Sequence, residues 1–320
     1  MYDIRIINDW EQCRDIWKST IPQETVWDIW EFRACFQKHF HRPTCFIAAE
    51  NSSGITDILP LSWIEEAQCY GYFPGETWQD KTWLEQNRIP ASSGILCDML
   101  NHCPGQYYLR YLRPSLGSIS QNQCTVDEVG YLFRPPDYNY DIENYFQQFS
   151  KKSAKSIKRE IASLQVGSRY RYDDMSDFEH LVQLNVNNFG NHSYFYDLRF
   201  QESFRTLMHY LNDKGWLRIT TIIISGEIAA VDIGCLYRGD YTLLGGGTNR
   251  DYPGVAKLIN LHHMQRGCRE RFNLIDFLCG DFSWKRKFHL TERPLYLLSN
   301  CPLETHPLED LELRGVGHVE

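Results

Sequence analysis

The sequence predicts an α+β fold made of two tandem lobes, each built on a mixed, largely antiparallel sheet. The chain has 320 residues, which is more than one hydrophobic core usually needs. Segments with helical and strand-like patterns alternate along it, and the run Arg134-Pro135-Pro136 interrupts regular structure near the middle. We therefore expect an N-terminal lobe over residues 1–143, a C-terminal lobe over residues 144–300 and a tail over residues 301–320.

The first lobe is expected to combine helices with short strands. Trp27, Trp30, Phe36 and Phe40 recur at helical spacing, which predicts a helix with one apolar face. Short apolar runs predict strands, although Pro60 weakens one of them. The expected elements are helices over residues 10–17 and 26–40 and within 83–97, strands over residues 45–50, 58–64, 107–112 and 129–133, and a turn over residues 71–75.

The second lobe begins with an amphipathic basic helix. Ala154, Ile157, Ile161 and Leu164 recur every three or four residues, with lysines and an arginine between them. The expected elements are helices over residues 150–164, 178–189, 200–211 and 254–271, and strands over residues 216–225, 228–237, 241–245 and 273–278. An antiparallel meander, a crossover helix and a final parallel strand are typical of an α+β lobe.

Composition excludes several classes of protein. A formal net charge of −8 disfavours DNA as a partner, because phosphate neutralisation needs clustered Lys and Arg. The 11 cysteines are scattered without a CxxC pair, which favours reduced thiols over disulfides or a structural zinc site. The N-terminus has no apolar signal region, and the longest apolar stretch, residues 219–224, is too short to span a bilayer. We expect a cytoplasmic protein without membrane insertion or metal.

The segment with the sharpest chemical signal is Asp-Phe-Leu-Cys-Gly-Asp-Phe-Ser-Trp-Lys-Arg-Lys-Phe, residues 276–288. Gly280 permits a sharp turn at the end of a strand. Asp281 then projects from an irregular position, where catalytic groups concentrate. Lys285 follows four residues later, close enough to pair with Asp281 or to share its cleft.

This segment resembles the end of the acyltransferase domain in the CelD/BioF2-like family of the GNAT superfamily, which reads Asp-Phe-Leu-x-Gly-Asp-x-x-Tyr-Lys-x-x-Phe/Trp. Trp284 replaces the usual Tyr, so the aromatic wall remains and the phenol is lost. The basic helix from Ser150, the hairpin over residues 226–232 and the segment 252–258 also resemble the family, in the same order. Related FemABX peptidyltransferases join two GNAT-like lobes, so the resemblance implies two such lobes here.

The resemblance implies transfer of an acyl group from acyl-CoA, without a tightly bound prosthetic group, to an amine or hydroxyl of a small-molecule or cell-envelope-related acceptor such as a glycan precursor. In GNAT folds the donor lies between two splayed strands, here residues 241–245 and 273–278, and its pyrophosphate rests on the next helix N-terminus. The expected donor-binding residues are Gly245, Gly246, Arg250, Gly254 and Lys257. The usual CoA loop is only partly matched, because Arg250 and Gly254 are four residues apart and Ala256 follows.

The resemblance also implies roles for individual side chains. Lys285 would stabilise the oxyanion that develops on the reacting carbonyl, and Asp281 or Asp232 would orient the acceptor or accept its proton. No cysteine lies in a recognisable nucleophile motif, so covalent catalysis is not expected. The expected acceptor pocket comprises Trp284, His192 and Tyr194.

Two other functions stay open at this stage. The donor could be an aminoacyl-tRNA, as in the FemABX relatives, with the basic helix over residues 151–159 contacting phosphates. That helix could equally be a solvated face of an acidic protein. The third possibility is a GNAT-like lobe pair that binds ligands without turnover, and replacement of Lys285 would separate it from an enzyme.

Overall fold

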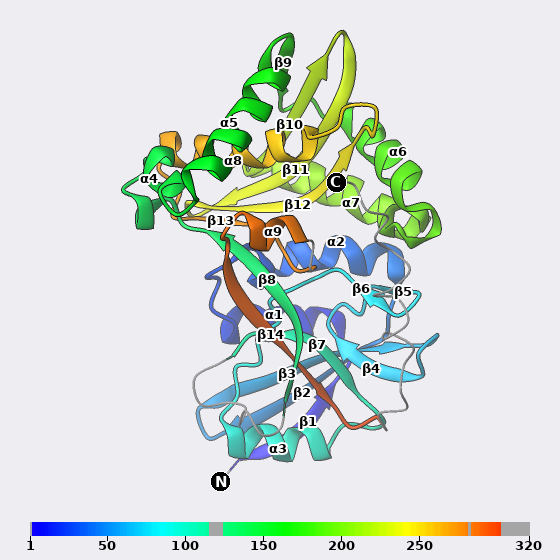
Figure 1. Ribbon diagram of the computed structural model, residues 1–320. Helices are drawn as coiled ribbons and strands as arrows, with labels where there is room; N and C mark the ends of the chain where they lie inside the picture. The colour runs from blue at the N-terminus through cyan, green and yellow to red at the C-terminus, as the bar shows by residue number, and fades with distance from the viewer. Residues whose placement is uncertain (1, 115–123, 281–282, 302–320) are drawn as a thin grey trace.

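The computed structural model describes residues 2–114, 124–280 and 283–301. Two lobes are stacked on each other, with the N-terminus in one and most of the residues after 134 in the other (Figure 1). Mixed helices and largely antiparallel sheets confirm the α+β prediction. Among the described residues, no helix combines the length and the apolar character that crossing a bilayer requires.

The first lobe is built on a four-stranded antiparallel sheet in the order β1-β2-β3-β4. Residues 45–49 at the centre of β2 are fully apolar and buried, because other elements cover both faces of the strand. The strands are β1 (Asp3–Ile7), β2 (Thr44–Asn51), β3 (Gly54–Ile64) and β4 (Cys69–Tyr72), with a separate two-stranded pair β5 (Thr77–Trp78) and β6 (Lys81–Thr82). The helices are α1 (Trp10–Thr20), α2 (Trp30–Phe40) and α3 (Ser93–Asn101).

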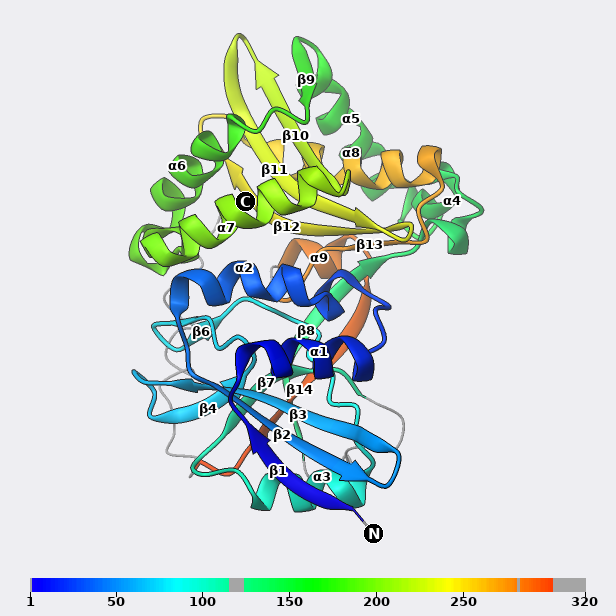
Figure 2. The same ribbon diagram turned by 180° about the vertical axis from the view of Figure 1, so that it is seen from behind.

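The second lobe follows the predicted meander. Strands β9 (Ser168–Tyr172), β10 (Leu217–Ile224), β11 (Glu227–Tyr237) and β12 (Asp240–Thr248) are antiparallel neighbours. Helices α6 (Asp177–Phe189) and α7 (Leu198–Asp213) cover one face, and α5 (Lys151–Gln165) and α8 (Val255–Glu270) cover the other (Figure 2). Strand β13 (Leu274–Asp276) pairs in parallel with β12 only over residues 240–242, so the two strands separate beyond that point.

Two long strands tie the lobes together. Strand β8 (Thr125–Phe133) pairs with β13 at one end and with β14 (Thr291–Ser299) along its length, and β14 also pairs with β7 (Tyr108–Leu112). An eight-stranded sheet in the order β7-β14-β8-β13-β12-β11-β10-β9 therefore runs through both lobes. Helix α2 of the first lobe also packs on α7 of the second, through Phe36 and Phe204 among others.

The structure differs from the expected elements in several places. β14 lies within the range expected for the second lobe, yet it pairs with β7 of the first lobe. The helix expected within residues 83–97 begins only at Ser93, because buried polar side chains hold residues 83–92 in irregular structure. Pro60 lies inside β3, opposite Phe46. Strands β1, β4, β9 and β14 were not expected from the sequence.

Candidate functional site

A tight turn follows β13 at the junction of the lobes. Leu278 has a φ of 60° and Gly280 a φ of 100°, so the chain turns sharply after Asp276. The N–H of Tyr131 in β8 donates to the Leu278 carbonyl at 3.2 Å, and the N–H of Phe277 donates to the Tyr131 carbonyl at 2.9 Å. The short helix α9 (Ser283–Lys287) begins just beyond, between the two lobes (Figure 1).

Lys285 points from α9 back into this turn. Its side chain is 3% exposed, and Nζ donates to the carbonyls of Leu278 at 2.9 Å and Cys279 at 2.8 Å. Nζ also lies 5.2 Å from the centre of the Tyr131 ring, within the range of a cation–π contact. Burial lowers the pKa of this ammonium, while the neighbouring carboxylates oppose that shift.

Glu85 reaches the same turn from the first lobe. Its Oε1 accepts the N–H of Cys279 at 2.8 Å. Its Oε2 is buried and has no hydrogen-bond partner among the described residues, and the closest cation, Nη2 of Arg293, is 3.8 Å away. Burial, and then the charge of Asp276, raise the pKa of Glu85 to about 7. A carboxyl group with such a pKa can accept and release a proton at neutral pH.

Asp276 holds the two lobes together beneath Glu85. Its Oδ2 accepts from Gln86 Nε2 at 2.7 Å and from Arg293 Nη1 at 2.8 Å. Its Oδ1 accepts the N–H of Leu278 at 3.0 Å and a longer bond of 3.3 Å from Arg293 Nη2. Both oxygens of this buried carboxylate are thus satisfied, which suits a structural clamp.

The cluster reaches the surface at the turn itself. Cys279 and Gly280 are partly exposed, and the Gly280 N–H donates to Oε2 of Glu128 at 3.2 Å. Burial raises the pKa of Glu128 as well. Nearby, Arg110 forms a bidentate pair with Asp127. We call the following set the inter-lobe cluster: Glu85, Gln86, Glu128, Asp276, Cys279, Lys285 and Arg293.

Asp232, expected to be catalytic, lies elsewhere. Its Oδ2 is 2.9 Å from Nε2 of His263 on α8, and both residues are at most 4% exposed. On the adjacent strand, a Cβ at Gly246 would lie 2.3 Å from Asp232 Oδ1, so only glycine leaves room for this carboxylate. The structure therefore pairs Asp232 with His263 inside the second lobe and does not bring it to Lys285.

The expected donor-binding residues lie where β12 separates from β13, and the chain's own side chains already contact them. Asn185 Nδ2 of α6 donates to the Gly246 carbonyl at 2.7 Å, and a Cβ at Gly245 would contact the ring of Phe195 at 3.4 Å. Arg250 donates to the carbonyl of Asn188 at 2.7 Å.

At the N-terminus of α8, Gly254 is the N-cap with a φ of 86°. A Cβ at Gly254 would lie 2.7 Å from Glu160 Oε1, so the Glu160 carboxylate of α5 faces this helix end. Lys257 forms an ion pair with the same carboxylate at 2.8 Å. A carboxylate beside a helix N-terminus is electrostatically favourable, and it stands where a pyrophosphate was expected.

The structure places the three expected acceptor residues in different surroundings. Tyr194 lies near the inter-lobe cluster: its hydroxyl donates to the Thr82 carbonyl at 3.0 Å, and burial raises its pKa, with Glu128 and Glu85 adding to the shift. His192 is exposed, and its carbonyl accepts from Lys81 of the first lobe. Trp284 packs edge-on against Phe277 and Phe288 in the core of the second lobe. Asp281 lies outside the described residues.

Sequence reasoning missed Glu85, Arg293 and Cys279. Glu85 and Cys279 are 194 positions apart, so no local pattern links them. The available signal was the polar run Glu85-Gln86-Asn87 directly after the apolar pair Trp83-Leu84, and this run proves to be buried. All three of its residues are at most 5% exposed.

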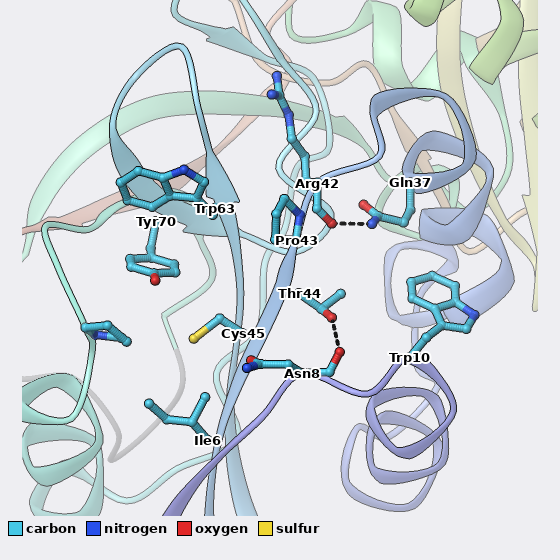
Figure 3. Close-up of a pocket in the computed structure, with 11 residues that line it drawn as sticks. Ile6, Asn8, Trp10, Gln37, Arg42, Pro43, Thr44, Cys45, Trp63 and Tyr70 are labelled. Carbon is cyan, nitrogen blue, oxygen red and sulfur yellow. Dashed lines mark hydrogen bonds between the residues drawn. The ribbon is translucent and has the colours of Figure 1, made fainter.

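A separate cavity of about 500 Å³ opens in the first lobe (Figure 3). Trp10, Trp63 and Tyr70 contribute aromatic walls, and Gln37 donates to the backbone carbonyl of Arg42 between them. The Arg42 guanidinium is engaged by Glu66 and by two backbone carbonyls. The cavity thus lacks the perturbed acid–base pair that distinguishes the inter-lobe cluster.

Comparison with known proteins identifies the second lobe. Residues 151–286, less than half of the chain, match the model of the acetyltransferase (GNAT) domain. This range contains Asp276, Cys279 and Lys285 but excludes Glu85 and Arg293. No curated protein matches the sequence significantly.

Solved structures share the fold over most of the chain. A conserved protein of unknown function from Bacteroides thetaiotaomicron superposes with a TM-score of 0.58 at 13% identity, covering 93% of this chain and 99% of that one. FemX gives 0.56 at 8% identity, with coverages of 92% and 97%. L-PGS from Bacillus licheniformis gives 0.56 at 12% identity, with coverages of 97% and 98%. The expected relationship to GNAT and FemABX-like proteins is thereby confirmed at the level of fold.

Proposed function

We propose that this protein is an acyltransferase that moves an acyl group from acyl-CoA to an amine or hydroxyl of a small-molecule or cell-envelope-related acceptor, and that the reaction takes place at the inter-lobe cluster. The observation that carries this proposal is Glu85: a buried carboxylate from the first lobe whose Oε2 has no hydrogen-bond partner among the described residues, next to Lys285 of the GNAT domain. A protein retains such a costly group where it serves a reaction.

The cluster supplies the two things that acyl transfer requires. Glu85, with a pKa of about 7, accepts the proton of the attacking nucleophile. Lys285 places a positive charge beside the turn where the carbonyl oxygen would gain negative charge. Asp276 and Arg293 fix both groups by joining β13 to β14. The acceptor enters at the partly exposed Cys279 and Gly280, beside Tyr194.

Acyl-CoA fits the second lobe in part. The separation of β12 and β13 leads toward the cluster, and Lys257 offers a cation for the pyrophosphate. Binding there requires Lys257 to exchange the Glu160 carboxylate for the phosphate, because both anions compete for the same helix end. On this account, the remaining candidates for donor contacts are Gly245, Gly246, Arg250 and Gly254.

Aminoacyl-tRNA is the second candidate donor. Two observations weigh against acyl-CoA and so favour it: Glu160 faces the N-terminus of α8, and Asn185 bonds the carbonyl of Gly246, an expected donor-binding residue. On α5, Lys151, Lys152 and Lys155 are exposed or nearly so, which could serve phosphate contacts. The binding of each donor therefore has to be measured directly.

The first experiment is calorimetric titration of the full chain with CoA and acetyl-CoA, followed by assays of acyl transfer to a panel of amines. Binding near micromolar affinity supports the acyl-CoA enzyme, and Lys257→Ala should weaken it. If neither compound binds, the aminoacyl-tRNA donor becomes the leading candidate.

A matched variant separates an enzyme from a binding module. Lys285→Ala should lower the acyl-transfer rate about 10²–10³-fold with little change in donor affinity, because the ammonium acts on the transition state. An unchanged rate would remove Lys285 from the reaction, and donor binding without any turnover in the native chain would indicate a module that only binds.

A further inference from the structure

The proposed reaction leaves the cavity of the first lobe without a role. This cavity lies where β1 ends and β2 begins. Its volume of about 500 Å³ falls within the range of about 300–1,000 Å³ that small-molecule sites occupy. The residues that line it fall between Ile6 and Pro104, so they lie outside the segment that matches the GNAT domain. A ligand bound there would be separate from the acyl donor of the second lobe.

Two aromatic rings form one corner of this cavity (Figure 3). Trp63 on β3 and Tyr70 on β4 are cross-strand neighbours, with ring centroids 5.0 Å apart and ring planes inclined by 62°. Both residues are partly exposed, so their rings are available to a ligand. Rings at this angle form a corner and not a parallel slot, and a puckered ring fits such a corner better than a flat one. Trp10 lies on the other side of the Pro43 backbone (Figure 3).

The cavity wall offers no unbalanced charge. Arg42 supplies its guanidinium, which points away from Thr44 (Figure 3) and is engaged by Glu66 and by two backbone carbonyls. The hydrogen bond from Arg42 lowers the pKa of Glu66 to about 2, so this carboxylate stays ionised beside the cation. Glu66 also pairs with Arg199 of the second lobe at 3.2 Å. Because no cation of the wall is left over for an anion, the cavity favours an uncharged ligand.

Several polar groups around the cavity have no partner within the described chain. The Asn8 amide, the Trp63 indole N–H and the Tyr70 hydroxyl make no hydrogen bond with any described residue. Gln37 donates through Nε2 to the carbonyl of Arg42, but its Oε1 is buried without a partner among the described residues. The cavity therefore offers both donors and acceptors, which is what hydroxyl groups need, because each hydroxyl donates one hydrogen bond and accepts others.

We propose that this cavity binds an uncharged pyranose sugar, with a C–H face of the ring against Trp63 and Tyr70 and its hydroxyls bonded to the Asn8 amide and the Tyr70 hydroxyl. A sugar ring has apolar faces of C–H groups and a polar rim, which matches an aromatic corner bordered by hydrogen-bonding groups. A flat apolar ligand would leave those polar groups unsatisfied. A phosphorylated sugar would find no free cation, because Arg42 is already paired.

The test is saturation-transfer difference NMR of the full chain with glucose, mannose and N-acetylglucosamine as probes. We expect millimolar binding of at least one of them, with transfer strongest to the protons on one face of the ring. Trp63→Ala should weaken binding at least about tenfold, because the aromatic wall is lost. Asn8→Ala should weaken it about three- to tenfold through the lost hydrogen bond. The matched control is Trp78→Ala, which removes a ring that stacks on Tyr196 outside the cavity and should leave the affinity unchanged.

Absence of binding by all three sugars at millimolar concentration would overturn the proposal. The same holds if Trp63→Ala and Asn8→Ala, each shown to be folded by its thermal transition, bind the sugars as the native chain does. Tighter binding of glucose 6-phosphate or of indole, lost in Trp63→Ala, would also contradict it, because the cavity would then select a charge or a flat apolar ring. The readout is binding without acyl transfer, so this proposal and the proposed function can fail separately.

Discussion

Two buried polar groupings, the Asp232–His263 pair and the inter-lobe cluster, differ in how their carboxylates are satisfied. Asp232 and His263 form a pair within a single lobe. At the inter-lobe cluster, Glu85 is equally buried, but its Oε2 has no partner in the described chain. Burial alone therefore does not mark a reactive carboxylate. The distinguishing features are an unsatisfied oxygen and a pKa raised to about 7.

The two groupings also differ in which segments of the chain supply their residues. The Asp232–His263 pair needs only the GNAT domain, residues 151–286. The inter-lobe cluster needs Glu85 and Gln86 from the first lobe and Arg293 from β14. On the proposed mechanism, the segment that matches the GNAT domain would lack the base without the first lobe.

The substitution Glu85→Gln gives the most severe test of the difference between the two groupings. The amide keeps the shape and can still accept the Cys279 N–H, but it cannot take a proton. We expect the acyl-transfer rate to fall about 10²–10⁴-fold. The melting temperature should stay the same or rise, because the change removes a buried charge whose nearest cation, Arg293, is already paired with Asp276. Steady-state rates and thermal unfolding of the same preparation measure both effects.

Asp232→Asn tests the other side of the comparison. We expect the unfolding free energy to fall by about 1–3 kcal/mol, because the buried bond to His263 is weakened. The acyl-transfer rate of the folded protein should stay within a few-fold of native. Chemical denaturation and a rate assay of the same variant measure both quantities. A rate loss comparable with that of Glu85→Gln would show that Asp232 takes part in the reaction.

The smallest expected effect concerns the donor. Glu160→Gln removes the carboxylate that faces the N-terminus of α8 and pairs with Lys257. Because a partly exposed pair contributes up to about 1 kcal/mol, CoA affinity should rise by no more than about fivefold. Calorimetry against native protein measures this. Weaker CoA binding in this variant would show that α8 does not hold the pyrophosphate.

The sequence predicted the second lobe well because its order of elements is local. Lys285 was found because it lies in one continuous segment with the strand and turn that position it. Glu85 could not be found, since its partners lie 190 or more positions away and meet only when the lobes pack. Strand β14 was missed because Pro294 interrupts its pattern, yet it pairs opposite Val129 within the sheet.

Asp232 shows a second limit of reasoning from the sequence, because its role was predicted but its partner was not. A strand aspartate in a segment resembling the family hairpin gave no indication of its partner, because His263 comes from the crossover helix 31 positions later. The sequence places His262 and His263 at adjacent helical positions, which face different directions. It had no means of showing that one of them binds a carboxylate.

The measurement that tests the central claim most directly is the pH dependence of the acyl-transfer rate in native protein and in Glu85→Gln. The charged groups that act on Glu85 include Asp276, which raises its pKa, and Arg293, which opposes that shift. As pH rises through about 7, Glu85 ionises and the native rate should rise to a plateau.

Stability should move in the opposite direction over the same range. The folded carboxyl holds its proton up to about 7, whereas its ordinary pKa is 4.5, so the folded state binds more protons between these values and the unfolding free energy falls as pH rises. We predict that the rise in rate near pH 7 disappears in Glu85→Gln. If the variant keeps the same inflection, or the native rate is flat through this range, Glu85 is not the base and the inter-lobe cluster is not the reaction site as described.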